Sequence, residues 1–349
     1  MAKKKVRILS IDGGGIRGII PATILQFIEN NLRKKYNPEA RIADYFDFVA
    51  GTSTGGILTL AYLVPDQEHP GKAKMTADDA LDIYVKRGGE IFNAGFSRKF
   101  MSLGGFIDER YDATPLEKAL NEYFGDNMLS QTLRPCMITA YDLKNRCAKF
   151  FTSADAVNNP LRDYKIKDVA RATSAAPTYF EPTRIMSSLG APTELIDGGM
   201  FANNPAMCAY AEARKMRFAS ISQDASKPEL PSAKDMYIVS IGTGTVVEEY
   251  PYEKMKDKGM AGWVKPLIDI LMSSNCETVT YHLKQMYKTL PQKDQGDYIR
   301  LEPSLYYASP DMADAGPKNI NRLREAGLVF VEKNYQLLDR ITDKLVEHH

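Results

Sequence analysis

One serine stands in a run of small residues, Gly51-Thr52-Ser53-Thr54-Gly55, that fits the pattern G-x-S-x-G. In this pattern the serine lies on a sharp turn between a strand and a helix, where bulky neighbours would collide with the backbone and cover the hydroxyl. The expected context is present, because an apolar segment at 45–50 predicts a strand and residues 55–63 predict a helix. The N-terminus of that helix would supply partial positive charge where an oxyanion forms. We therefore predict that Ser53 is the nucleophile of a serine acyl hydrolase, with Gly51 and Gly55 supporting the turn.

A glycine-rich segment at residues 12–18, Asp-Gly-Gly-Gly-Ile-Arg-Gly, follows a short apolar segment at 6–11 that predicts a buried strand. A tight run of backbone N–H groups close to a serine nucleophile suits an oxyanion hole. Arg17 in this segment could brace the loop or attract an anionic head group, and bracing is the favoured role. The expected oxyanion-hole donors are the N–H groups of Gly13, Gly14, Gly15 and Thr54.

The same segment also satisfies G-x-G-x-x-G, the pattern of a dinucleotide-binding loop, so a nucleotide-binding protein is the alternative from a different class. That pattern needs an acidic residue at the end of the second strand. Asp44 precedes the expected second strand and Asp47 lies within it, and the strand leads directly into the turn that carries Ser53. The oxyanion hole is therefore the favoured interpretation.

A serine nucleophile needs a base, and Asp197 ends an expected strand beside Gly198 and Gly199. Active sites gather at the ends of strands in open α/β sheets, but aspartate before glycine also forms turns and helix caps. From these residues alone the two roles of Asp197 are equally supported. Histidine is the usual base, yet His69 lies in a polar loop and His282 lies on the face of an expected helix, where histidine is more often structural.

Expected strands alternate with expected helices along the chain, which predicts an α/β fold in three layers: a mostly parallel central sheet with helices on both faces. We expect a single domain over residues 1–349, with a core at about 6–304, a helical extension at about 317–345 and a tag remnant at 347–349. A capping box is expected at Thr114 to Glu117. Further strands are expected at about 134–141, 148–152, 193–196 and 236–241, and further helices at about 21–36, 76–92, 167–175, 204–217 and 263–289.

Residues 93–110 combine glycines with scattered apolar side chains and show no periodicity. They are expected to form an irregular loop that either folds back on the core or acts as a lid and lipid-contacting surface, the first being favoured. Farther along, Gly242-Thr243-Gly244-Thr245 follows an expected strand and could line the same cleft or form a plain turn.

The chain has 349 residues, a net charge of +1, 44% hydrophobic and 26% charged residues. This balance is ordinary for a globular enzyme and gives no electrostatic basis for binding nucleic acid. The four cysteines lie far apart and form no C-x-x-C pair, so neither a zinc site nor a redox motif is expected, and we expect no cofactor and no metal. Without a secretory signal or a spanning apolar run, we expect a cytoplasmic protein whose membrane association, if any, is peripheral.

With these motifs in place, the sequence resembles the patatin-like phospholipases over residues 6–304. Up to residue 245 the matches form a long, ordered and specific set, and beyond that point the match is weaker. The matching segments are Asp12 to Pro21, Ala40 to Asp47, Gly51 to Gly56, Thr173 to Phe180, Ile196 to Gly199, Asn203 to Pro205 and Ser240 to Thr245.

The resemblance implies a fold similar to the core of cytosolic phospholipase A2 and a Ser–Asp dyad in place of a triad, which accounts for the scarcity of histidine. Ser53 would be the nucleophile, Asp197 its base and the amides of residues 13–15 the oxyanion hole. The family acts on fatty acyl esters of phospholipids and galactolipids, without a metal. Some bacterial relatives are effectors switched on by cyclic nucleotides, so a phospholipase activated by a small-molecule second messenger is an alternative role. The last expected helix could mediate a homodimer, although packing on the core is favoured.

Overall fold

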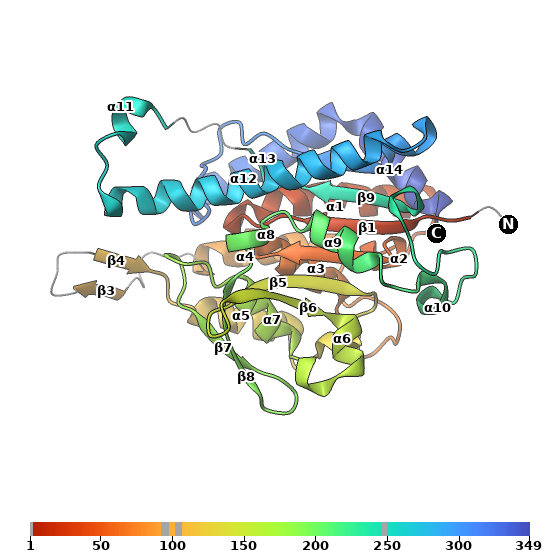
Figure 1. Ribbon diagram of the computed structural model, residues 1–349, viewed down its shortest axis with the longest axis horizontal. Coiled ribbons are helices and arrows are strands. Elements are labelled where there is room, and N and C mark those ends of the chain that lie inside the picture. Colours follow the sequence, from red (N-terminus) through yellow and green to blue (C-terminus); the bar gives the residue numbers. More distant parts are fainter. Residues whose placement is uncertain (1–2, 92–97, 102–106, 246–249) are drawn as a thin grey trace.

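The computed structural model describes residues 3–91, 98–101, 107–245 and 250–349. These residues form an eight-stranded sheet with helices around it (Figure 1). Its strands are β1 (Val6–Ile11), β2 (Phe48–Thr52), β5 (Cys136–Asp142), β6 (Cys147–Thr152), β7 (Thr183–Met186), β8 (Pro192–Asp197), β9 (Met236–Ile241) and β10 (Tyr298–Leu301). Their order is β10-β9-β1-β2-β5-β8-β7, with β6 also paired to β5. The first five strands in this order run parallel, whereas β6, β7 and β8 join antiparallel. The predicted mostly parallel sheet is confirmed.

The central strand β1 is buried on both faces, so its side chains enter two separate apolar cores. Leu9 and Ile11 belong to the larger core, whereas Val6 and Ile8 belong to the smaller one, as the two-residue period of a strand requires. Parallel strands that are covered on both faces consist of continuous apolar residues. This is why β1 and β9 could be predicted from the sequence with their observed bounds.

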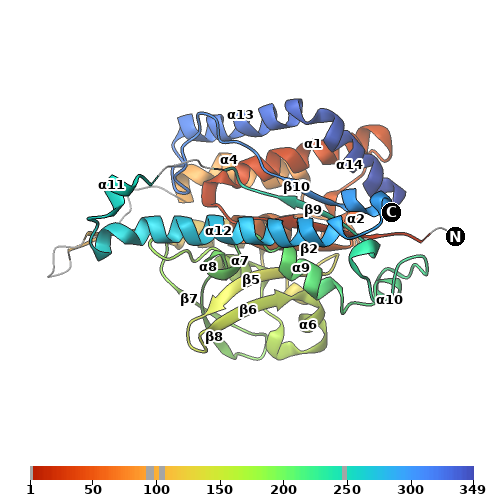
Figure 2. The ribbon, with the colours of Figure 1, turned by 45° about the horizontal axis from the view of Figure 1, so that its top comes forward.

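Helices cover both faces of the sheet, which completes the expected three layers. In both views α13 lies alongside α1 (Figures 1 and 2). The larger core is closed by α1 (Ile19–Lys35), α3 (Thr54–Leu63), α4 (Ala77–Ile91), α5 (Thr114–Phe124), α7 (Ile166–Thr173), α13 (Pro317–Lys333) and α14 (Tyr335–Glu347). The smaller core is closed by α9 (Ala206–Ala213) and α12 (Met260–Lys288).

Short elements connect these layers. The helical ones are α2 (Ile42–Tyr45), α6 (Ser153–Asn158), α8 (Gly199–Ala202), α10 (Phe218–Ser222) and α11 (Tyr252–Met255), with 3₁₀ turns η1 (Gly15–Gly18), η3 (Leu129–Gln131), η4 (Pro160–Arg162), η5 (Ala233–Asp235) and η6 (Gln292–Asp297). An antiparallel hairpin is formed by β3 (Arg98–Met101) and β4 (Ile107–Arg110). The expected irregular loop at 93–110 therefore contains a hairpin. The lid hypothesis depends on residues such as Phe96 and Phe106, which lie outside the described residues.

The expected starting residues of two elements are wrong, because hydrogen bonds between neighbouring residues determine where these elements begin. The second strand begins at Phe48, three residues later than expected, since the preceding residues form α2, in which the Asp44 carboxylate accepts the Arg41 N–H at 2.9 Å. The capping box expected at Thr114 is absent. Thr114 is itself the first residue of α5, and its N–H donates to the Asp112 carboxylate at 2.9 Å.

The longest helix, α12, has 29 residues and contains Pro266. In both views its N-terminal half reaches past the end of the central sheet, towards α11 (Figures 1 and 2). The helix expected at 317–345 is divided at Asn334 into α13 and α14. Among the described residues, no helix is both long and apolar enough to cross a membrane.

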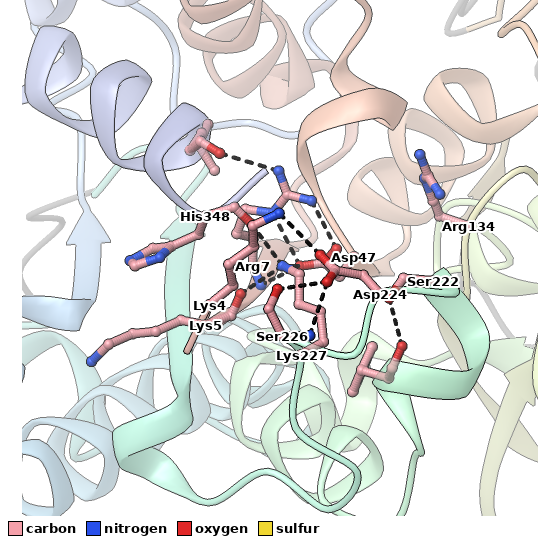
Figure 3. A network of polar contacts seen from close by, with 12 residues as sticks. Lys4, Lys5, Arg7, Asp47, Arg134, Ser222, Asp224, Ser226, Lys227 and His348 are labelled. Atoms are coloured by element: carbon pink, nitrogen blue, oxygen red, sulfur yellow. Dashed lines mark hydrogen bonds and ion pairs between the residues drawn. The ribbon is translucent and has the colours of Figure 1, made fainter. Parts of the chain in front are cut away.

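A buried ionic cluster, Arg7–Asp47–Lys227, lies at the amino ends of β1 and β2 (Figure 3). The Asp47 carboxylate accepts from the Arg7 guanidinium at 2.8 Å and from the Lys227 ammonium at 2.7 Å. The Lys227 ammonium also donates to the backbone carbonyls of Lys5 at 2.7 Å and His348 at 2.8 Å. Burial lowers the pKa of Lys227 to about 8, against the opposing charge of Asp47. The cluster ties the start of the sheet to the end of α14.

Candidate active site

Ser53 lies between β2 and α3 in a strained backbone conformation, with φ 53° and ψ −122°. Such a conformation costs a non-glycine residue about 1–3 kcal/mol, and it is held by the Ser53 N–H, which donates to Thr173 Oγ1 at 2.8 Å. Both flanking positions require glycine, because other backbone atoms lie too close to leave room for a Cβ atom. A Cβ on Gly51 would lie 2.2 Å from the Gly55 carbonyl oxygen, and one on Gly55 would lie 2.1 Å from the Ile11 carbonyl oxygen.

The structure brings the Asp197 carboxyl, at the end of β8, together with Ser53. The Ser53 hydroxyl is close enough to the Asp197 carboxyl to influence its pKa, and the carboxyl accepts a hydrogen bond from the Gly199 N–H at 2.7 Å. Strand β8 pairs antiparallel with β5 up to Asp197, which places the carboxyl at the edge of the serine turn. A Cβ on Gly198 would lie 2.2 Å from Thr139 Oγ1, so only glycine fits where the chain leaves β8.

Burial sets the protonation of Asp197, which is only 4% exposed. It raises the pKa of this carboxyl to about 7, although the hydrogen bonds from Ser53 and Gly199 act in the opposite direction. A carboxyl with a pKa near neutrality can accept and release a proton at physiological pH, as a general base must. The arrangement can therefore perform acid–base chemistry on the Ser53 hydroxyl.

The glycine loop, residues 12–18, passes directly over Ser53, because a Cβ on Gly13 would lie 3.3 Å from the Ser53 Cβ. The Gly13 N–H donates to the Asn203 carbonyl at 3.0 Å, so it is not available to an oxyanion, and the expected role of Gly13 as a donor is corrected. Among the described residues, none accepts a backbone hydrogen bond from the N–H of Gly14 or Gly15. The expected donors that line the pocket are Gly14, Gly15 and Thr54.

A buried ion pair holds the start of the glycine loop. Arg300 on β10 donates to both carboxylate oxygens of Asp12, at 2.9 and 2.6 Å, and both side chains are almost fully buried. The Thr243 hydroxyl donates to the Gly13 carbonyl at 2.7 Å, so the turn at 242–245 supports the loop from below the pocket. Sequence reasoning missed Arg300, because it lies near the other end of the chain in a short strand without a motif.

Asn203 holds the glycine loop from the side of α12. Its backbone carbonyl accepts the Gly13 N–H, and its side-chain amide donates to Cys276 Sγ at 3.3 Å. The Cys276 thiol in turn donates to the Asp12 carboxylate at 3.5 Å. Burial raises the pKa of this thiol, which keeps it protonated and unreactive. The motif Asn203-Asn204-Pro205 was visible in the sequence, but its contact with the glycine loop was not.

Arg17 is buried, and its Nε donates to the Gly14 carbonyl at 3.4 Å, the contact that a bracing role requires. Burial lowers the pKa of the guanidinium, and the charge of Asp269 on α12 is the largest opposing influence. Arg17 thus connects the glycine loop electrostatically with the helix that covers the site.

An apolar pocket of about 950 Å³, including its open mouth, adjoins Ser53 and Asp197. Its wall is nearly all hydrocarbon and comes from the glycine loop, α3, α4, α5, the segment at 174–180, α8, α12 and the segment before α13. The apolar side chains of the wall include Ile16, Ile57, Ile83, Ile91, Leu116, Leu120, Pro177, Phe180, Met200, Ile268, Met272 and Met312.

The other candidate residues lie elsewhere. His69 is in an exposed loop beside Asp66, at 2.9 Å, and His282 is on the exposed side of α12, so no histidine of the described chain lines the pocket. Asp44 caps α2, and Asp47 belongs to the ionic cluster at the opposite ends of the strands. The dinucleotide interpretation therefore lacks its acidic residue. Within the described ranges no group of metal-binding side chains occurs.

Comparison with known proteins places this geometry in a family context. A family model described as patatin-like phospholipase matches residues 9–210. Patatin-like protein 2 of Arabidopsis thaliana is 35% identical over 94% of this chain and 83% of its own length, and Patatin group J-1 of Solanum tuberosum is 32% identical over 95% and 85%. Among solved structures, VipD from Legionella pneumophila aligns with 93% of this chain and 67% of that chain at 14% identity, with a TM-score of 0.36. That likeness is distant, and the fold assignment follows from the strand order itself.

Proposed function

Because this chain belongs to the patatin-like phospholipase family, we propose that it is a serine carboxylic-ester hydrolase that releases fatty acids from phospholipids or galactolipids. The observation that carries the proposal is the pairing of the Ser53 hydroxyl with the buried Asp197 carboxyl, both of which line the same apolar pocket. A fatty acyl ester is hydrocarbon except at its carbonyl. A pocket with hydrocarbon walls and reactive polar groups at one place matches that distribution.

In the proposed first step, Asp197 accepts the Ser53 proton while the Ser53 Oγ attacks the ester carbonyl carbon. The carbonyl π bond opens, and its oxygen becomes an oxyanion that the N–H groups of Gly14, Gly15 and Thr54 stabilise. The tetrahedral species then collapses. The bond to the alcohol oxygen breaks, Asp197 returns the proton to that oxygen, and the lysolipid or other alcohol leaves an acyl-Ser53.

In the second step, Asp197 takes a proton from a water molecule that attacks the acyl-Ser53 carbonyl. The same N–H groups stabilise the second oxyanion, and collapse of this species breaks the bond to Ser53 Oγ, which receives the proton back. Fatty acid is released and the dyad is restored. One carboxyl performs both transfers, so both steps require Asp197 to be ionised when the attack begins.

Substitution of either dyad member tests the proposal. We expect Ser53→Ala and Asp197→Asn each to lower the turnover of defined phospholipids and galactolipids by at least about 10³-fold. The reason is that the first variant lacks the attacking oxygen and the second lacks the base. Released fatty acid and lysolipid are measured by mass spectrometry, and circular dichroism verifies that both variants are folded.

The matched control is His282→Ala, which removes an exposed histidine on α12 that lies outside the pocket. This variant should hydrolyse the same lipids at the rate of the unmodified chain. Full activity in folded Ser53→Ala or Asp197→Asn protein would exclude the dyad, and loss of activity in His282→Ala would point to a histidine-dependent mechanism instead.

A further inference from the structure

The N-terminal half of α12 exposes a stripe of large apolar side chains to solvent. Each member of this outer stripe is between 39% and 91% exposed. At 3.6 residues per turn the members lie within about 120° of the helix circumference. The outer stripe consists of Met260, Trp263, Val264, Leu267, Ile270 and Leu271.

The outer stripe is continuous with the wall of the candidate active site. Ile268 and Met272 lie on the adjoining side of the same helix and line the apolar pocket beside Ser53. An apolar surface therefore runs from the solvent-facing side of α12 to the mouth of the pocket. Between Leu267 and Met272 the helix carries one charged side chain, Asp269. Asp269 is itself engaged, because its carboxylate accepts from the Tyr250 hydroxyl at 2.8 Å.

The surroundings of the outer stripe fit a lipid surface. The stripe contains the only tryptophan of the chain, and tryptophan prefers the boundary between hydrocarbon and head groups. Exposed lysines precede it at positions 254, 256 and 258, where their long side chains could extend to phosphate groups. A helix with one apolar side and polar residues opposite lies in the plane of a bilayer surface, with its apolar side among the upper acyl chains.

We propose that the outer stripe of α12 inserts into the surface of a phospholipid bilayer and so delivers acyl chains directly to the pocket. This inference rests on the proposed function and deepens it, since it names the physical state of the substrate and the element that contacts it. An acyl chain that left the bilayer along Leu267, Ile268 and Met272 would reach the dyad without exposure of its hydrocarbon to water. The free energy of extraction is thereby kept small.

The first measurement uses the full chain carrying Ser53→Ala, so that binding is read without hydrolysis. Emission reports on the outer stripe alone, because Trp263 is the only tryptophan. On addition of dioleoylphosphatidylcholine vesicles we expect a blue shift of this emission, and we expect quenching by vesicles whose acyl chains carry bromine. Emission that is unchanged at saturating lipid would overturn the inference.

A pair of variants separates the outer stripe from general surface apolarity. We expect Leu267→Asp to weaken partition into the vesicles at least about tenfold, because a carboxylate in the stripe opposes insertion. Leu161→Asp is the matched control, since Leu161 is 50% exposed and Leu267 is 51% exposed, but Leu161 lies in η4, outside α12 and the pocket wall. Equal weakening by both substitutions would contradict a specific role of α12.

Activity measurements distinguish failure of this inference from failure of the proposed function. With an intact Ser53, Leu267→Asp should reduce hydrolysis of vesicle phospholipid about as much as it reduces partition, and should leave hydrolysis of a soluble short-chain ester unchanged. If the unmodified chain hydrolyses neither substrate, the proposed function is wrong, while the fluorescence result still decides on bilayer insertion. If Leu267→Asp lowers the oligomeric mass measured by light scattering and leaves partition unchanged, the stripe binds a second copy of the chain and the inference is overturned.

Discussion

In the proposed mechanism Asp197 combines two tasks that a triad divides between a histidine and a carboxylate. It would both orient the Ser53 hydroxyl and accept its proton. An exposed aspartate has a pKa of about 3.9 and is a weak base. Burial at the wall of an apolar pocket raises the pKa of Asp197 to about 7, which makes the carboxylate a stronger base that is still ionised above neutral pH. In this proposal the low polarity of the site substitutes for the missing histidine.

This protonation equilibrium predicts the pH dependence of turnover. We expect kcat/KM for a soluble ester to rise as the pH increases towards about 7 and then to level off, because only ionised Asp197 can accept the Ser53 proton and its pKa is about 7. Initial rates between about pH 5 and 9 measure the profile. A rise centred near pH 4 would mean that the base is an unperturbed carboxyl, and the buried Asp197 would then not be the group that titrates.

The same shift predicts a pH-dependent effect of Asp197→Asn on stability. Between pH values of about 4 and 7 the folded state binds a proton at Asp197 that the unfolded state has released, so the free energy of unfolding falls as the pH rises through this window. The total loss is on the order of a few kcal/mol for a shift of this size. The variant carries no such charge, so it should be more stable than the unmodified chain at pH 8, and the difference should shrink at pH 4.

Urea unfolding at both pH values measures this difference. Asp126→Asn is the control, because Asp126 is an exposed carboxylate whose pKa is lowered to about 2 by hydrogen bonds from Lys165 and Lys167. That variant should show no gain in stability at pH 8. A stability difference for Asp197→Asn that does not change with pH would mean that the carboxyl is not desolvated in the folded chain.

The candidate site could be predicted from the sequence where its chemistry depends on local pattern. Ser53 and its glycines occupy one tight turn, so close backbone contacts restrict each position to a recognisable residue type. Asp197 was ambiguous by pattern alone, since aspartate before glycine has other uses, and the family resemblance favoured its role as the base. Arg300 and Thr173 could not be predicted, because their contacts arise only when distant segments meet across the sheet.

Among the elements, strand β10 supports the candidate site from outside, since none of its residues lines the pocket. It carries Arg300, whose guanidinium pairs with Asp12 at the start of the glycine loop. Burial alone would lower the pKa of this guanidinium, but the charges of Asp12 and Glu302 raise it, so Arg300 stays charged. The short edge strand thereby holds the loop that presents the Gly14 and Gly15 N–H groups.

We predict that Arg300→Gln lowers kcat by about 10–100-fold with little change in KM, because the proposed oxyanion-hole donors lose their alignment while the apolar pocket is unaffected. It should also reduce the free energy of unfolding by about 3–5 kcal/mol, since Asp12 is left as a buried charge without a partner. Steady-state kinetics and urea unfolding measure the two effects.

Two further variants show whether the effect comes from positioning. Arg300→Lys restores the charge with a single donor group, so it should recover part of kcat. Arg184→Gln removes an exposed arginine that pairs with Glu194 at 2.5 Å, and it should change neither quantity appreciably. If folded Arg300→Gln protein turns over at the unmodified rate, the ion pair has no role in aligning the loop.

Elements could be predicted where burial of a defined face sets the spacing of apolar residues along the sequence. Strands β1 and β9 are mostly apolar because both of their faces are covered, and their bounds were predicted correctly. Strands β7 and β10 have four residues each and were missed, since so short a segment shows no period. The start of β2 was misplaced because the aromatic residues before it suit a strand, while the hydrogen bonds of α2 favour a helical turn.

For the whole molecule, the cluster Arg7–Asp47–Lys227 joins the two ends of the chain (Figure 3). We predict that Asp47→Asn lowers the free energy of unfolding by about 3–5 kcal/mol, because two buried cations then face each other without a counter-charge. The activity of the folded fraction should be unchanged, since the cluster lies at the opposite ends of the strands from Ser53. Thermal or urea unfolding together with ester hydrolysis measures both effects.

The comparison variant is Asp155→Asn, which removes a more exposed carboxylate that pairs with Arg162 at 2.6 Å. Its stability should stay within about 0.5 kcal/mol of that of the unmodified chain. Similar stability losses in the two variants would show that charge removal in general, and not the burial of this cluster, determines the result.

The central position of β1 also has a consequence for biosynthesis. Strand β1 is made first, yet one of its edges is covered by β9, which leaves the ribosome roughly ten seconds or more later at about 5–20 residues per second. During that interval the edge presents unpaired backbone groups to other chains. Thr243 and Arg300, which hold the glycine loop, are synthesised later still. We therefore expect the proposed lipid hydrolase to reach full activity only after nearly the whole chain has been translated.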